Sequence, residues 1–137
     1  MSLEINPRER EGIVIFDMKG RLTAEEASAL REAVSGLRSS GKNQGILNLE
    51  DVDYIDSTGL GTMVIGFTSL QKAGGKLKLL NLTRRNIELM LLTKLETVFE
   101  IFDDEQSAVN SFFPNREIRR FDILKFIQQQ RKQDQSG

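Results

Sequence analysis

The segment Ile55–Gly61 (Ile-Asp-Ser-Thr-Gly-Leu-Gly) combines the residue types best suited to chemistry in this sequence. Asp56 and Ser57 can cap the free amides of a following helix, and a helix start also carries a positive dipole end. Gly59 and Gly61 remove side chains from the first turn, so that another protein or a phosphate could approach closely. Glycine costs about 1 kcal/mol relative to Ala inside a helix. The segment therefore indicates either a well-capped helix start or a surface that receives a partner.

Composition excludes several kinds of catalytic site. The sequence has no His and no Cys, which rules out Ser-His-Asp and Cys-His pairs, a phosphohistidine relay, Cys/His zinc sites and disulfides. It contains no Gly-x-x-x-x-Gly-Lys-Ser/Thr phosphate loop, and Ser57 does not lie in a Gly-x-Ser-x-Gly motif. Asp53 and Asp56 could together hold Mg²⁺, but such clustered acids are more typical of a solvated loop. We therefore expect no enzyme activity, no catalytic residue, no metal and no cofactor.

Length and charge are typical of one small binding domain. The 137 residues fit a single domain, and residues 1–114 carry 13 basic and 17 acidic side chains. Residues 115–137 carry six basic and three acidic ones. An acidic body argues against nucleic acid as a partner. The longest apolar runs have four residues, whereas a membrane span needs about 20, and the N-terminus lacks a secretory pattern. We expect a cytoplasmic protein with no membrane partner.

Alternating strand and helix patterns must position the Asp56 segment. Apolar runs predict buried strands at 12–19 and 44–49, with a short edge strand at 3–5 and an acidic connection at 50–56. Apolar residues at helical spacing follow from Ser57 and stop at Gly74. The remaining predicted elements are strands at 76–80 and 98–102 and helices after residue 23, after residue 83 and at 107–113. This order predicts an α/β layer, in which the groove beyond the strand ends usually carries the function.

Cap signatures precede three of the predicted helices. Thr23-Ala24-Glu25-Glu26 is a capping box, in which the Thr23 hydroxyl takes one free amide and Glu26 reaches back to another. Thr83 and Asn86 resemble another cap. The segment Asp103-Asp104-Glu105-Gln106 carries an Asp-x-x-Gln capping signal before the helix at 107–113.

The hexapeptide Asp56–Gly61, preceded by Asn48–Val52 and by Tyr54-Ile55, resembles the signature of the STAS domain. The similarity is greatest to bacterial anti-sigma factor antagonists. Further matches are Gly20-Arg21-Leu22 and Gly74-Gly75-Lys76-Leu77, and the resemblance covers roughly Leu3 to Phe113. It implies a single layer of mixed, largely parallel strands with helices packed mainly on one side. We expect an STAS domain over 1–114 and a helical extension over 115–137.

The resemblance also implies a phosphorylation switch. Unphosphorylated members of the family bind an anti-sigma factor that is also a serine kinase, and so release the sigma factor for transcription. The kinase phosphorylates the Ser after the Asp, which is Ser57 here, and a serine phosphatase restores binding. Family members often carry an acid where this chain has Thr23. The residues implied to contact the partner are Asp53, Asp56, Thr58, Gly59, Leu60, Gly61 and Thr23.

Other interpretations remain open for the domain and for its tail. The domain could be a non-switching STAS scaffold in a signalling or lipid-transport assembly, with Ser57 only a helix cap. A small-molecule binder would lack a dedicated phosphate loop. In the tail, the apolar residues cover more than one stripe of a helix, so that this helix either packs on its own body or forms a homodimer contact. These residues are Ile118, Phe121, Ile123, Leu124, Phe126 and Ile127.

Overall fold

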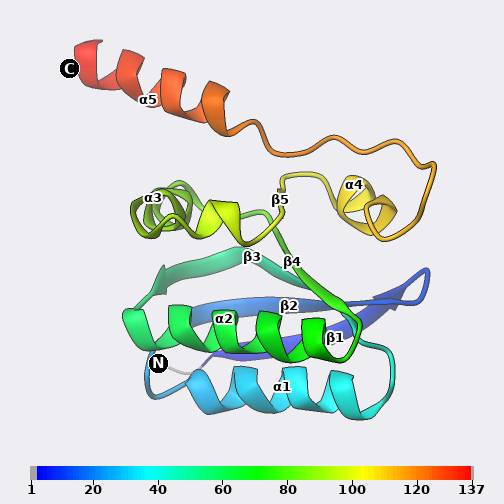
Figure 1. Cartoon of the computed structure of the whole chain (residues 1–137). Coiled ribbons are helices and arrows are strands. Elements are labelled where there is room, and N and C mark those ends of the chain that lie inside the picture. The colour runs from blue at the N-terminus through cyan, green and yellow to red at the C-terminus, as the bar shows by residue number, and fades with distance from the viewer. Residues whose placement is uncertain (1–2, 137) are drawn as a thin grey trace.

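The strands form one sheet in a computed structural model that describes residues 3–136 (Figure 1). They are β1 (Glu4–Arg10), β2 (Ile13–Leu22), β3 (Gln44–Ile55), β4 (Lys76–Leu80) and β5 (Ile101–Phe102). Neighbours follow the order β1-β2-β3-β4-β5, with β1 antiparallel to β2 and every other pair parallel. The expectation of a mixed, largely parallel layer is confirmed.

Helices lie on both sides of this sheet, with more of them on one side. They are α1 (Ala27–Ser39), α2 (Ser57–Lys72), α3 (Arg84–Thr93), α4 (Glu105–Asn110) and α5 (Ile123–Ser136), and a short 3-10 helix spans Leu95–Thr97. α1 and α2 lie side by side along one face, whereas α4 lies on the other (Figure 1). α5 is the appended C-terminal helix and lies apart from the sheet.

Side chains that alternate along β2 divide between two cores. Phe16 and Met18 point into the larger core, which lies between the sheet and α1 and α2 and also takes up Met90 of α3. Ile13 and Ile15 point to the opposite face and pack in the smaller core with α4. Because a β-strand sends successive side chains to opposite faces, one strand serves both cores.

The strands on either side of the Asp56 segment are longer than predicted. β2 continues past Gly20 to Leu22, and the expected acidic connection at 50–56 is instead the second half of β3. Val52 there is fully buried, and an irregular register pairs β3 with β2 as far as Leu22 and Ile55. The exposed acids among these buried residues suggested a loop. The local pattern did not indicate the strand, because it contains no information on pairing with a distant segment.

The predicted capping box at Thr23 is wrong. α1 begins only at Ala27, and its N-cap residue Glu26 makes no side-chain cap hydrogen bond. Residues 24–26 form a turn in which the Glu26 amide donates to the Thr23 carbonyl at 3.0 Å. The Ala24 amide donates instead to the Asp56 carboxylate, so a distant side chain supplies the acceptor.

The other predicted helix starts need smaller changes. Thr83 caps α3 as expected, accepting from the Asn86 amide at 3.3 Å. α4 is capped by Asp104, which accepts from the Ser107 amide at 2.9 Å, so the signal was one residue out of register. Of the strand predicted at 98–102, only β5 pairs with β4, and the edge strand predicted at 3–5 extends through β1.

The chain after Pro114 begins as a segment held against the body. Ile118 packs on the smaller core and Phe121 on the larger one. The Phe121 amide also donates to the Ile101 carbonyl of β5 at 3.2 Å. The helix of the tail therefore begins only at Ile123, after these anchors.

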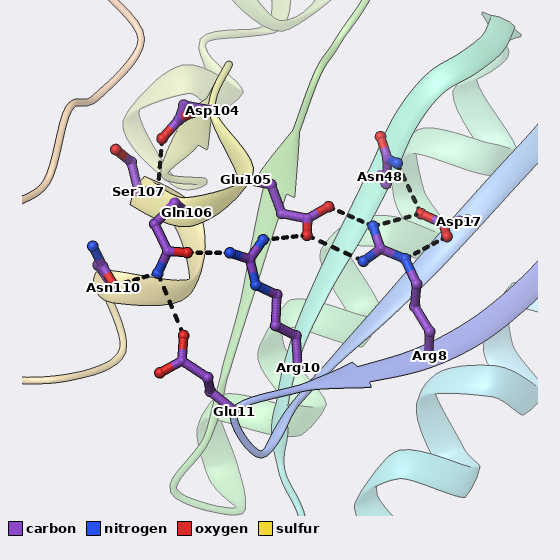
Figure 2. A network of polar contacts seen from close by, with 10 residues as sticks. All are labelled: Arg8, Arg10, Glu11, Asp17, Asn48, Asp104, Glu105, Gln106, Ser107 and Asn110. Carbon is purple, nitrogen blue, oxygen red and sulfur yellow. Dashed lines mark hydrogen bonds and ion pairs between the residues drawn. The ribbon is translucent and has the colours of Figure 1, made fainter.

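A network of ion pairs fastens the β1–β2 hairpin to α4 (Figure 2). Arg8 pairs with Asp17 at 2.6 Å and also with Glu105, while Arg10 contacts Glu105 and Gln106. The hydrogen bonds from Arg8 are the main cause that lowers the pKa of Glu105 to about 2. The network joins residues almost a hundred positions apart and so closes the smaller core.

Acid should weaken this network. A carboxyl whose pKa falls from 4.5 to about 2 on folding contributes stability that is present above 4.5 and is lost as the pH drops towards 2. Glu105→Gln is therefore expected to lower the free energy of unfolding near neutral pH and to have little effect at the acid end of this range. Urea unfolding at several pH values tests this, with the exposed Asp103→Asn as control. A Glu105→Gln effect that does not change with pH would contradict it.

Candidate partner-binding site

Asp56 joins the end of β3, the start of α2 and the corner after β2. One carboxylate oxygen, Oδ1, accepts from the Gly59 amide at 2.8 Å and caps α2. The other, Oδ2, accepts from the Ala24 amide at 3.0 Å, while the Asp56 amide donates to the Leu22 carbonyl at 3.1 Å. The Gly59 amide is the main cause that holds the pKa of Asp56 below its ordinary value, with support from Ala24. Asp56 is therefore charged and fixed in place.

Ser57 and Thr58 open α2 and are both exposed. The Thr58 carbonyl accepts from the Thr62 hydroxyl at 2.9 Å, so it is the backbone of Thr58, and not its side chain, that this bond engages. No acidic residue lies in the first turn of α2, so the charge opposing an added phosphate comes from outside the helix. The helix N-terminus favours negative charge, and a phosphate on Ser57 is compatible with the fold.

The two glycines of the motif differ in their surroundings. A Cβ atom on Gly59 would lie 2.3 Å from the Leu22 carbonyl oxygen, so this glycine permits close contact between α2 and the end of β2. A Cβ on Gly61 would meet nothing within 4 Å. Leu60 lies between them and packs in the larger core, 8% exposed. Gly59 and Leu60 thus face inward, and Gly61 faces outward.

Thr23 and Asp56 are brought together from different elements. Both line a shallow cavity of about 320 Å³, together with Arg21, Ala24 and Glu25. Asp53 is exposed on β3 and does not line this cavity. Of the residues predicted from the sequence, Thr23, Asp56, Ser57, Thr58 and Gly61 make up the accessible surface around the start of α2, with Asp53 nearby in the chain.

Sequence reasoning missed a cluster of two arginines around Tyr54. The guanidinium carbons of Arg21 and Arg85 each lie 4.6 Å from the centre of the Tyr54 ring. Arg21 and Tyr54 are paired residues of β2 and β3, whereas Arg85 comes from the first turn of α3. The only signals were Gly20-Arg21-Leu22 and the two arginines after Thr83, and neither indicates that they share one ring.

Between residues 3 and 136, no cluster of three or more His, Cys, Asp or Glu side chains has an arrangement that could hold a metal ion. In the same part of the chain, no helix combines the length and apolar character needed to cross a membrane.

Comparison with known proteins identifies the family. A family model described as the STAS domain matches residues 4–108, which is most of the chain. The chain belongs to the STAS domain family. The resemblance carried by Asp56–Gly61 and its neighbouring segments is thereby confirmed, and the five-stranded sheet is the STAS sheet of this chain.

Relatives of this STAS chain share one name. The anti-sigma-B factor antagonist of Bacillus subtilis (strain 168) is 34% identical over 109 residues, which are 80% of this chain and 99% of the relative. The protein of that name from Listeria monocytogenes is 35% identical over 104 residues, or 74% of this chain and 88% of the relative. Because antagonists act by binding, these relatives bear out the expectation that the STAS chain is not an enzyme.

Solved structures give the same fold. A crystal structure of a proposed anti-sigma factor antagonist from Thermotoga maritima superposes with a TM-score of 0.74 at 26% identity, covering 78% of this chain and 92% of that one. The anti-sigma factor antagonist SpoIIAA in its unphosphorylated form gives a TM-score of 0.63 at 19% identity. It covers 80% of this chain and 97% of SpoIIAA and supports the fold alone.

Proposed function

We propose that this STAS chain is an anti-sigma factor antagonist controlled by phosphorylation of Ser57. Unphosphorylated, it binds an anti-sigma factor that is also a serine kinase, and the sigma factor is released. The match to the Bacillus subtilis antagonist over 99% of that protein carries the proposal. The exposed hydroxyl of Ser57, held next to the fixed Asp56, supports it.

The proposed contact surface surrounds the start of α2. Ser57, Thr58 and Gly61 supply its exposed part, with Thr23 and Asp53 at its edges. Gly61 keeps open space above the helix, since nothing lies within 4 Å of its Cβ position. Asp56, Gly59 and Leu60 position this surface, because they fix the helix against the Leu22 corner and the larger core.

Phosphorylation would disrupt such a contact while leaving the fold intact. A phosphate adds about −1.5 to −2 charges at neutral pH. It would join Asp56 and the exposed acids Glu50, Asp51 and Asp53 at the same end of the sheet. The start of α2 tolerates this charge, but an interface built for a neutral hydroxyl does not, because repulsion and desolvation both oppose binding. A serine phosphatase would then restore the binding-competent form.

Incubation with the serine-kinase anti-sigma factor of the source organism and ATP tests the proposal. Intact-mass measurement and site mapping are expected to show one phosphate, on Ser57. Thr58→Ala is the matched control and should still accept it, whereas Ser57→Ala should not. If the kinase modifies another antagonist in the same preparation but leaves this chain unmodified, the phosphorylation switch is rejected. The interpretation as a non-switching STAS scaffold then takes its place.

Exposed apolar side chains on α3 and α5 favour a homodimer contact through the C-terminal helix. α5 lies near α3, because the side-chain amide of Gln130 donates to the Glu88 carboxylate at 3.1 Å. Leu91 and Phe126 line an apolar groove between the two helices. Leu92 is 84% exposed and Leu124 is 72% exposed. Large exposed apolar side chains on both helices favour burial against a second copy.

Light scattering of the full chain and of residues 1–122 tests the dimer. This truncation removes α5 but keeps Ile118 and Phe121, which pack on the body. The full chain is expected to have twice the mass of a monomer, and both the truncated chain and Leu124→Ser should be monomeric. Monomeric mass for the full chain would reject the dimer and favour a helix that packs only on its own body.

A further inference from the structure

Arg21 carries a positive charge beside the start of α2, and no ion pair among the described residues uses it. Its guanidinium contacts the Tyr54 ring, and Arg85 contacts the same ring. None of the ion pairs recorded for residues 3–136 includes either arginine. Many other basic side chains of the body do have a carboxylate partner, as Arg8 and Arg10 show (Figure 2). Arg21 can therefore change partners without breaking an ion pair.

The backbone places Arg21 close to Ser57. The Leu22 carbonyl accepts from the Asp56 amide, and the Ala24 amide donates to the Asp56 carboxylate, so residues 22–24 wrap around Asp56. Arg21 lines the same cavity as Asp56, and its charge helps to lower the pKa of that carboxyl. Ser57 is the next residue and is exposed. Arg21 therefore lines the cavity beside Asp56, and its long, flexible side chain could turn from Tyr54 toward a phosphate on the next residue.

We propose that Arg21 is the counter-ion of a phosphate on Ser57, and that phosphorylation draws its guanidinium away from Tyr54. This inference deepens the proposed function and rests on Ser57 being the phosphorylated residue. A guanidinium forms paired, charge-assisted hydrogen bonds with phosphate, and these are stronger than its contact with the half-buried Tyr54 ring. Arg85 stays on Tyr54, because it comes from α3 and does not line the cavity.

The surrounding charges favour such a counter-ion. Glu25 and Asp56 line the cavity with Arg21, and Asp53 is exposed on β3, three residues before Asp56. These carboxylates oppose a phosphate dianion, and Arg21 is the one cation among the residues that line this cavity. Phosphorylation then alters two neighbouring parts of the surface at once, the Ser57 hydroxyl and the cluster at Tyr54.

The experiment introduces phosphoserine at position 57 during translation, so that it requires no kinase. Phosphorus NMR against pH then gives the pKa of the phosphate in four proteins: the wild-type background, Arg21→Ala, Arg21→Lys and Arg85→Ala. We expect Arg21→Ala to raise the phosphate pKa by about one unit, Arg21→Lys to raise it less, and Arg85→Ala to leave it unchanged. Arg21 is exposed, so its removal should not affect folding, which circular dichroism checks.

Tyr54 supplies a second measurement. It is the only tyrosine, and the chain has no tryptophan, so the ring signals of tyrosine report on this cluster alone. Phosphoserine at 57 should shift the Tyr54 ring resonances, and Arg21→Ala should abolish that shift. Equal phosphate pKa values with and without Arg21, or a Tyr54 shift that persists in Arg21→Ala, would overturn the proposal. Failure of a kinase to modify Ser57 would count against the proposed function but not against this test.

Discussion

Ser57→Asp is expected to weaken binding to the anti-sigma factor about 100-fold, or ~2.7 kcal/mol, whereas Ser57→Ala should bind as the unmodified protein does. The hydroxyl of Ser57 is exposed at the start of α2, beside the fixed charge of Asp56. A carboxylate there must lose its water on binding and also meets the neighbouring negative charge. The alanine variant keeps a small neutral surface but can no longer be switched.

Calorimetric titration of both variants against the anti-sigma factor measures this difference. Thr68→Asp is the matched control, because it adds one negative charge to an exposed position further along the same helix. It should change affinity little. Equal affinities of Ser57→Asp and Ser57→Ala for the anti-sigma factor would contradict the phosphorylation switch. If Thr68→Asp weakened binding as much as Ser57→Asp does, the effect would be one of long-range charge and not of a local interface.

Gly59→Ala is expected to lower the free energy of unfolding by about 3 kcal/mol, or roughly 10 °C in Tm. The added Cβ would lie 2.3 Å from the Leu22 carbonyl oxygen and 2.8 Å from the Leu22 side chain. The backbone of β2 cannot move aside easily, because the same carbonyl accepts from the Asp56 amide. The first turn of α2 would have to shift, and the Asp56 cap with it.

Gly61→Ala is the matched control, two residues away in the same helix. Its Cβ would stand in open space, so better helix propensity should make the protein more stable by up to ~1 kcal/mol. The same methyl group should weaken partner binding, because it occupies the proposed contact surface. Thermal unfolding of both variants measures the contrast. Similar stabilities would show that α2 and Leu22 are not in the close contact described.

Local signals predicted the centre of the site well. The helix from Ser57, its Asp56 cap and the Thr83 cap of α3 all depend on residues within four positions of one another. Such signals work because a helix start needs an acceptor for its own free amides, and the chain supplies it nearby. Apolar patterns predicted the order of strands and helices around that centre, and the family resemblance added that the strands form one mixed, largely parallel layer.

The corner at Thr23 shows where local signals fail. The capping box there has suitable residues, yet Asp56, 32 positions away, takes the Ala24 amide. The acids after Leu49 likewise suggested a connection, although pairing with β2 makes them part of β3. In both cases a partner distant in sequence provided the hydrogen bonds, and tertiary contacts override a local preference when they satisfy the same backbone groups.

By itself, then, the sequence determined the chemistry available to this protein: no histidine or cysteine, and one Asp-Ser-Thr-Gly helix start that carries the Ser57 hydroxyl. Only the tertiary structure decided which residues surround that hydroxyl. It turned Gly59 inward and Gly61 outward, and it gathered Arg21 and Arg85 on Tyr54 from three different elements. The reason is physical: composition limits which groups exist, whereas strand register and helix packing determine which of them meet.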